Sequence, residues 1–159
     1  MLNFAYQEHV RSYYFDSRNQ DFQFPPLTQI EHADVCVIGA GFFGLSAALE
    51  LAEKGKKVSV LEGARVGFGS SGRSGGQAIN GFEEGIDEYI KQVGEDKAHK
   101  LWNMSLETID IIDERIEKYS IQCDWKKGYA TLALNERRMD DLIEMEKVSH
   151  KNFGYQNMQ

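Results

Sequence analysis

The sequence predicts an α/β fold, and three observations in the first half of the chain support it. The β-branched run at residues 35–38 is typical of a buried parallel strand. A glycine-rich turn and then a helical pattern follow this run, and a second apolar run over residues 57–61 ends at Glu62. This order of strand, turn, helix and strand predicts a Rossmann-like βαβ unit.

The turn carries the spacing Gly-x-Gly-x-x-Gly, which indicates a dinucleotide site. Gly39 permits the tight turn, Gly41 lets the backbone approach a pyrophosphate, and Gly44 lets the helix pack closely on the strand. The helix N-terminus offers N–H groups to phosphates, and Glu62 is placed to bind a ribose. An alternative is an α/β core whose glycines serve packing alone, and it leaves Glu62 unexplained. The predicted cofactor-binding residues of this part are Gly39, Ala40, Gly41, Phe42, Phe43, Gly44 and Glu62.

The segment after Glu62 holds six glycines in residues 63–77, too many for an ordinary helix or strand. We predict a loop that wraps a ligand with backbone groups and hydroxyls, with Arg73 near anionic groups. A flexible linker is the alternative, but linkers rarely carry Arg, Phe and Gln in such a run. The predicted binding residues of the loop are Ser70, Ser71, Arg73, Ser74, Gly75, Gly76 and Gln77.

Around this unit we expect an aromatic N-terminal arm over residues 1–32, the binding unit over 33–81, and a helical region over 82–159. Helical periodicity begins at Phe82 and breaks at Gly94, and Trp102 lies on the apolar face, where we expect core packing. A short strand is predicted over residues 128–134. Asn135 is then the expected N-cap of a last helix over 136–152.

Composition narrows the classes of function. A net charge of −7 argues against a nucleic-acid partner. No apolar run approaches a membrane span, and no signal peptide is evident. Cys36 and Cys123 form neither a metal pattern nor a disulfide framework, and Cys36 is expected to be a buried strand residue. We therefore expect a cytoplasmic setting and no metal.

Only two strands are evident in the predicted nucleotide-binding unit. A doubly wound sheet needs more strands to cover its edges and both of its faces. We therefore expect an incomplete doubly wound sheet, and a chain that corresponds to the N-terminal part of something longer.

Taken together, the motifs resemble the FAD-dependent oxidoreductases of the D-amino-acid oxidase type, and most closely the γ-glutamylputrescine oxidase-like amine oxidoreductases. The resemblance rests on the arm that runs from Ser12 to Pro26, on the pattern GxGxxGxxxAxxLxxxG with its later Glu, and on residues 67–77. The last segment, GFGSSGRSGGQ, is the most specific. It has Ser74 where the family pattern has Asn, and the exchange keeps a hydrogen-bonding side chain.

The resemblance implies a two-domain flavoenzyme with non-covalent FAD, an amine substrate and oxygen as the electron acceptor. The glycine turn would face the pyrophosphate, Glu62 the adenosine ribose, and residues 71–77 the phosphates and the flavin ring. No residue of this sequence is identified as a catalytic acid, base or nucleophile.

Two other hypotheses stay open. Family members are considerably longer and complete their FAD domain after a substrate domain, so the chain is alternatively a non-catalytic, truncated nucleotide-binding fragment. An NAD-binding dehydrogenase fragment is also compatible with Glu62, although such a domain has no need of the loop over residues 67–77. The sequence leaves the oligomeric state open.

Overall fold

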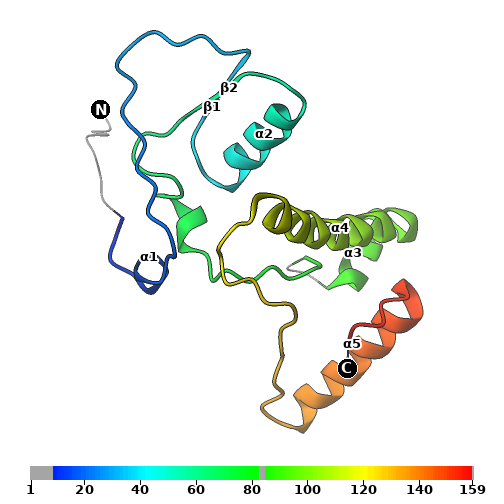
Figure 1. Cartoon of the computed structure of the whole chain (residues 1–159). Coiled ribbons are helices and arrows are strands. Elements are labelled where there is room, and N and C mark those ends of the chain that lie inside the picture. Colours follow the sequence, from blue (N-terminus) through cyan, green and yellow to red (C-terminus); the bar gives the residue numbers. More distant parts are fainter. Residues whose placement is uncertain (1–8, 83–84, 159) are drawn as a thin grey trace. The chain divides into compact units, whose positions relative to one another are not determined.

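The structure is a computed structural model that describes residues 9–82 and 85–158, and it divides into two compact units, Met1–Gln77 and Ala78–Gln159. Figure 1 labels the elements along the chain. The first unit contains α1 (Tyr13–Asp16), β1 (Val35–Ile38), α2 (Phe42–Glu53), β2 (Val58–Leu61) and the 3₁₀ turn η1 (Ser70–Arg73). The second contains α3 (Ile86–Val93), α4 (Glu95–Tyr119) and α5 (Glu136–Phe153).

The first unit is built on a parallel pair of strands joined by α2 (Figure 1). Val35 pairs with Val58, and Ile38 pairs with Leu61. Helix α2 ends in a Schellman motif, in which the Lys56 N–H donates to the Leu51 carbonyl at 3.0 Å and Gly55 adopts a φ of +78°. The predicted α/β class with a small parallel sheet is therefore confirmed, and β2 begins one residue later than expected.

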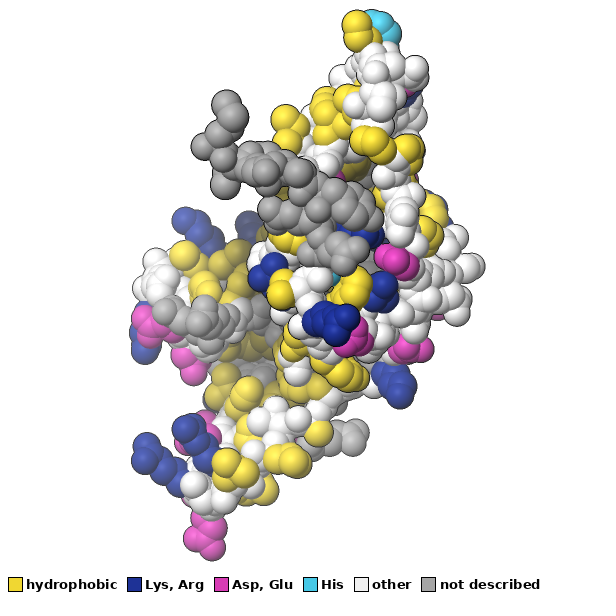
Figure 2. Space-filling view, turned by 90° about the vertical axis from the view of Figure 1, so that its left-hand side faces the viewer, with side chains coloured by type: hydrophobic (Ala, Val, Ile, Leu, Met, Phe, Trp, Pro, Cys, Tyr) yellow, Lys and Arg dark blue, Asp and Glu magenta, His cyan; other side chains and the backbone are white. Residues whose placement is uncertain are grey.

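The sheet has two strands among the described residues, and much of the apolar surface of the first unit is exposed. Ile38 is 87% exposed and Phe43 is 89% exposed, whereas the buried apolar residues of this unit are Ala40 and Ala48. Figure 2 shows hydrophobic side chains of the chain, in yellow, at many places on the face turned to the viewer. The described residues therefore do not display a doubly wound sheet, and that part of the prediction stays a prediction.

The second unit is helical, and its helix ends follow local rules. Gly94, with a φ of +84°, separates α3 from α4, where the sequence predicts a break. The Asn135 side chain accepts a hydrogen bond from the Arg138 N–H at 3.0 Å, which confirms the predicted N-cap of α5. Gly154 ends α5 in the left-handed conformation.

Trp102 lies in the core of this second unit, as predicted, with only 9% of its surface exposed. Its ring lies 5.1 Å from that of Phe153 and 5.7 Å from that of Tyr155. The Ser105 hydroxyl donates to the Trp102 carbonyl at 2.7 Å and accepts from the Gly81 N–H at 3.0 Å. These contacts tie α4 to α5 and to the segment before α3.

Three predictions are corrected by the structure. Residues 128–134 form no strand, because a strand needs a hydrogen-bonded partner and no described segment pairs with them. Cys36 is exposed rather than buried, because no described element covers its side of β1. The helix expected from Phe82 begins at Ile86, with Gly85 as its N-cap, and residues 83–84 lie outside the described residues.

A polar cluster holds the segment after α4. Asp113 accepts hydrogen bonds from the Trp125 indole N–H at 2.8 Å and from the Lys127 ammonium group. These two hydrogen bonds hold the pKa of Asp113 below its ordinary value, and the bond from Lys127 has the larger effect. The bond to Asp113 in turn raises the pKa of Lys127.

Candidate functional site

The candidate site is the glycine turn between β1 and α2, and Gly39 sets its path. Gly39 has a φ of +99°, a conformation that L side chains rarely adopt. Its N–H donates to the Leu61 carbonyl at 2.7 Å, so the turn leaves β1 while it is still bonded to β2. The chain can therefore rise sharply from the end of the sheet.

Gly44 allows the first turn of α2 to lie directly against this bend. A Cβ built at Gly44 would overlap the Gly39 carbonyl and would lie 3.4 Å from Cγ1 of Val37. No side chain fits there unless the helix moves away from β1. Glycine at this position is thus explained by close packing of helix on strand.

The Glu62 carboxylate closes the turn from the end of β2. One oxygen accepts from the Ala40 N–H at 2.8 Å, and the other accepts from the Ala64 N–H at 3.0 Å. Ala40 is only 1% exposed, so the carboxylate supplies an acceptor to a buried amide. A carboxylate has about four lone-pair sites, so two oxygens that each accept one bond can still accept ribose hydroxyls.

The N-terminus of α2 is open on one side and contacts the glycine-rich loop on the other. Gly41, the N-cap, supplies no side-chain bond, and Phe42 is 65% exposed. The Ser71 hydroxyl accepts from the Phe42 N–H at 3.0 Å. A Cβ on Gly41 would lie 2.9 Å from that hydroxyl, so a side chain at this position would press on Ser71.

The glycine-rich loop folds back onto the turn through backbone contacts. The Gly67 N–H donates to the Ala40 carbonyl at 2.9 Å, and a Cβ on Gly72 would overlap the Gly67 carbonyl. Arg73 donates to the Phe68 carbonyl at 3.4 Å. The loop is therefore locally folded around η1.

The structure brings some predicted residues together and leaves others apart. The residues of the turn, Glu62 and Ser71 form one connected group. Ser70 is exposed on η1, and the segment from Ser74 to Gln77 bends on itself, with the Gly76 N–H donating to the Ser74 hydroxyl at 3.3 Å. Sequence reasoning missed Arg65, whose side chain is 14% exposed, although its charge inside a glycine-rich loop was a visible signal.

These features fit a dinucleotide. A helix N-terminus that is exposed and lacks a side-chain cap from its own N-cap residue favours an anion, because its first N–H groups have no partner within the helix. A turn without Cβ atoms at Gly39 and Gly41 lets a pyrophosphate approach the backbone. No cluster of metal-ligating residues occurs in the described part of the chain, and no described helix is long and apolar enough to cross a bilayer.

The site thus has the geometry expected of a nucleotide-binding βαβ unit, and sequence comparison gives the family of the chain. Residues 34–158 match DAO, the family of FAD dependent oxidoreductases. The chain belongs to this FAD-dependent family.

Relatives of the chain carry related names. It is 98% identical over all of its 159 residues to "Probable oxidoreductase OrdL" of Haemophilus influenzae, covering 37% of that protein. It is 42% identical over 152 residues, or 96% of this chain, to "Gamma-glutamylputrescine oxidoreductase" of Escherichia coli, covering 35% of that protein. A second "Probable oxidoreductase OrdL", from Rhizobium meliloti, is 28% identical over 85% of this chain and 32% of its own length. The chain therefore spans about a third of the length of these relatives, from 32% to 37%, and no solved structure shows significant similarity to it.

Proposed function

We propose that this chain supplies the FAD-binding βαβ unit of an amine oxidoreductase. The observation that carries the proposal is the closed turn in which Glu62 bonds the Ala40 amide beside the open N-terminus of α2. The family match supports FAD, and the relative named as a gamma-glutamylputrescine oxidoreductase supports an amine substrate.

Each part of the site has a proposed role toward the cofactor. The backbone of Gly39, Ala40, Gly41, Phe42, Phe43 and Gly44 would hold the pyrophosphate, with the α2 dipole favouring its charge. Glu62 would accept the hydroxyls of the adenosine ribose. Ser71, which accepts from the Phe42 N–H, still has a hydroxyl proton to donate to a phosphate oxygen.

FAD, when bound, would accept a hydride equivalent from the carbon beside an amine and pass the electrons to oxygen. The amine would leave as an imine that water hydrolyses, and oxygen would become hydrogen peroxide. This chain's own residues bind and orient the cofactor, and we expect non-covalent binding. The alternative is a nucleotide-binding unit without catalysis of its own.

The first test is the visible absorption spectrum of the purified chain, before and after addition of FAD and desalting. We expect retained flavin bands in the parent and their loss in Gly41→Val, because the new side chain presses on Ser71 and fills the pyrophosphate approach. Gly85→Val is the matched control, because a Cβ there meets nothing within 4 Å and the residue lies in the second unit. A parent that stays colourless contradicts FAD binding by this chain alone.

The second test separates the enzyme from the non-catalytic fragment. The flavin-loaded chain is mixed with γ-glutamylputrescine or a simple amine, and peroxide is followed. Peroxide above the level of the Gly41→Val variant supports the amine oxidoreductase, whereas flavin retention without peroxide supports the fragment.

A further inference from the structure

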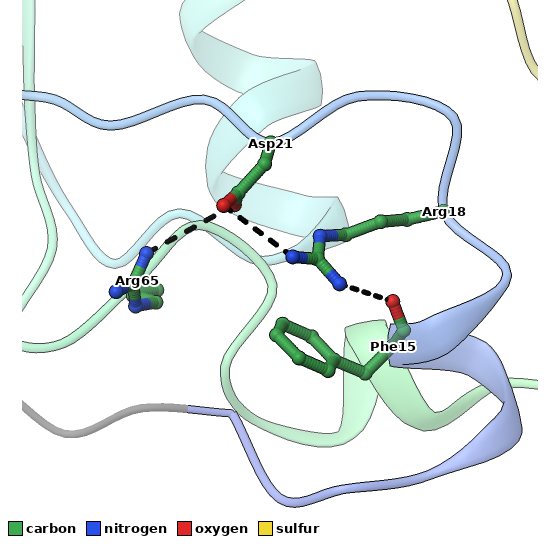
Figure 3. Close-up of polar contacts among 4 residues, drawn as sticks. All are labelled: Phe15, Arg18, Asp21 and Arg65. Carbon is green, nitrogen blue, oxygen red and sulfur yellow. Dashed lines mark hydrogen bonds and ion pairs between the residues drawn. The ribbon is translucent and has the colours of Figure 1, made fainter.

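The part of the N-terminal arm over residues 9–24 contacts the glycine-rich loop that carries Ser71. The arm is braced internally (Figure 3). The Ser12 hydroxyl accepts from the Phe15 N–H at 3.2 Å and caps α1. Arg18 donates to the Phe15 carbonyl, and its guanidinium lies 3.6 Å from the centre of the Phe15 ring. A second nitrogen of Arg18 lies 3.3 Å from the Asp21 carboxylate, so this part of the arm is linked from Ser12 to Asp21.

Two contacts join this braced arm to the loop. Asp21 Oδ1 lies 3.9 Å from Arg65 Nη1, and Figure 3 shows Asp21 between Arg18 and Arg65. The His9 ring lies between two phenylalanines, 5.3 Å from Phe15 on the arm and 5.7 Å from Phe68 on the loop. Arg65 and Phe68 are separated by two residues, so the arm holds one short stretch by an ion pair and by ring packing.

That short stretch is in turn connected to the α2 N-terminus. It contains Gly67, whose N–H donates to the Ala40 carbonyl at 2.9 Å. Three residues after Phe68, the Ser71 hydroxyl accepts from Phe42 N–H. Because the Gly67 carbonyl is packed against Gly72, a shift of the stretch would be transmitted to η1.

We propose that the N-terminal arm is a positioning element for the cofactor loop, with Asp21 and His9 as its positioning residues. Through Arg65 and Phe68 the arm keeps Ser71 at the N-terminus of α2, where the proposed function places the pyrophosphate. The arm therefore sets how tightly the chain holds FAD, and this last statement rests on the proposed function.

The test begins without cofactor, by hydrogen exchange of the intact chain. Asp21→Asn removes the charge that pairs with Arg65 and with Arg18. We expect exchange in residues 64–73 and at the Phe42 amide to rise about two- to fivefold, the range of an ion pair whose carboxylate is exposed to solvent. Asp21→Glu keeps the charge and should retain protection. Asp16→Asn is the matched control, because Asp16 lies on the same arm and forms no ion pair among the described residues.

Salt distinguishes an ionic clamp from general loosening of the arm. Near 1 M NaCl the screening length falls to about 3 Å, so the parent and Asp21→Asn should exchange alike. Phe68→Ala should raise exchange at both salt concentrations, because ring packing is not screened. Equal exchange in Asp21→Asn and Asp16→Asn at low salt would overturn the clamp.

The dissociation constant for FAD then tests the second half of the proposal. We expect the dissociation constant of Asp21→Asn to be about two- to fivefold larger than that of Asp16→Asn, in line with the exchange result. An unchanged dissociation constant for FAD, together with faster hydrogen exchange in the loop, would overturn the link between the arm and the cofactor. A parent that binds no FAD would contradict the proposed function, whereas the exchange experiment would still decide whether the arm positions the loop.

Discussion

Glu62 offers the sharpest test of how the turn is held, through the variant Glu62→Ala. The substitution removes the acceptor of the Ala40 N–H, and the residue that bears this amide is 1% exposed. A buried donor left without a partner costs about 1–3 kcal/mol. The Ala64 amide is half-buried and water can replace its lost bond, so it adds little. We therefore expect the first unit to lose about 1–3 kcal/mol of unfolding free energy in the absence of any cofactor.

Urea unfolding of the intact chain measures this loss. With an m-value of about 1 kcal/mol/M for a small unit, the midpoint of the first unit should fall by about 1 M or more. Both tryptophans, Trp102 and Trp125, lie in the second unit, so their fluorescence should keep its midpoint while the circular dichroism signal of the first unit shifts. Hydrogen exchange at the Ala40 amide should accelerate with the shift.

Two variants bracket the Glu62 result. Glu62→Gln keeps an amide oxygen that can accept from the Ala40 N–H and should retain most of the stability. Glu50→Ala is the matched control, because Glu50 forms an exposed pair with Lys54 on α2 and its loss should cost no more than about 0.5 kcal/mol. If the unfolding free energy of the first unit in Glu62→Ala lies within about 0.5 kcal/mol of that of the parent, the carboxylate does not hold the turn and the reasoning fails.

Two further predictions concern packing and pH. Gly44→Ala should destabilise the first unit by about 1–3 kcal/mol in urea unfolding, because the new Cβ overpacks on the Gly39 carbonyl. Gly69→Ala is the control and should be nearly neutral, because a Cβ at Gly69 meets nothing within 4 Å. The lowered pKa of Asp113 means that its bonds stabilise the second unit above the pKa of the unfolded carboxyl, and that this stability is lost as pH falls through the folded value, below about pH 4. The Trp125 indole N–H resonance should therefore shift on acidification in the parent, and in Asp113→Asn it should stay constant; a pH-dependent shift in both would contradict the assignment.

The parts of the fold that could be predicted from the sequence depend on neighbours along the chain. The Schellman motif at Gly55 and the cap at Asn135 are decided within a few residues of each helix end. The βαβ unit was predictable for the same reason, because the turn at Gly39 and the flanking apolar runs adjoin one another.

The errors arose where a residue's state depends on distant parts of the molecule. Residues 128–134 have the composition of a strand, but a strand exists only with a partner, and Leu132 and Leu134 are 82% and 92% exposed. The exposure of Cys36 likewise depends on what covers β1. Asp21 and Arg65 are single charges far apart in the sequence, and no periodic pattern links them.

In the candidate site, the kind of ligand was more predictable from the sequence than the hydrogen bonds that hold the turn in place. The spacing of Gly39, Gly41 and Gly44 identifies the turn, but it does not reveal that Glu62 bonds the Ala40 amide or that Ser71 bonds the Phe42 amide. These two bonds hold the turn and the start of α2 in place in the chain without cofactor. A ligand that meets an ordered site loses less free energy to ordering it than one that must fold the loop. With these bonds in place, the Glu62 carboxylate still has lone pairs that accept no hydrogen bond, and the Ser71 hydroxyl still has a proton to donate. The turn can therefore be both internally bonded and competent to bind, and stability without cofactor and affinity for cofactor should fall together when either bond is removed.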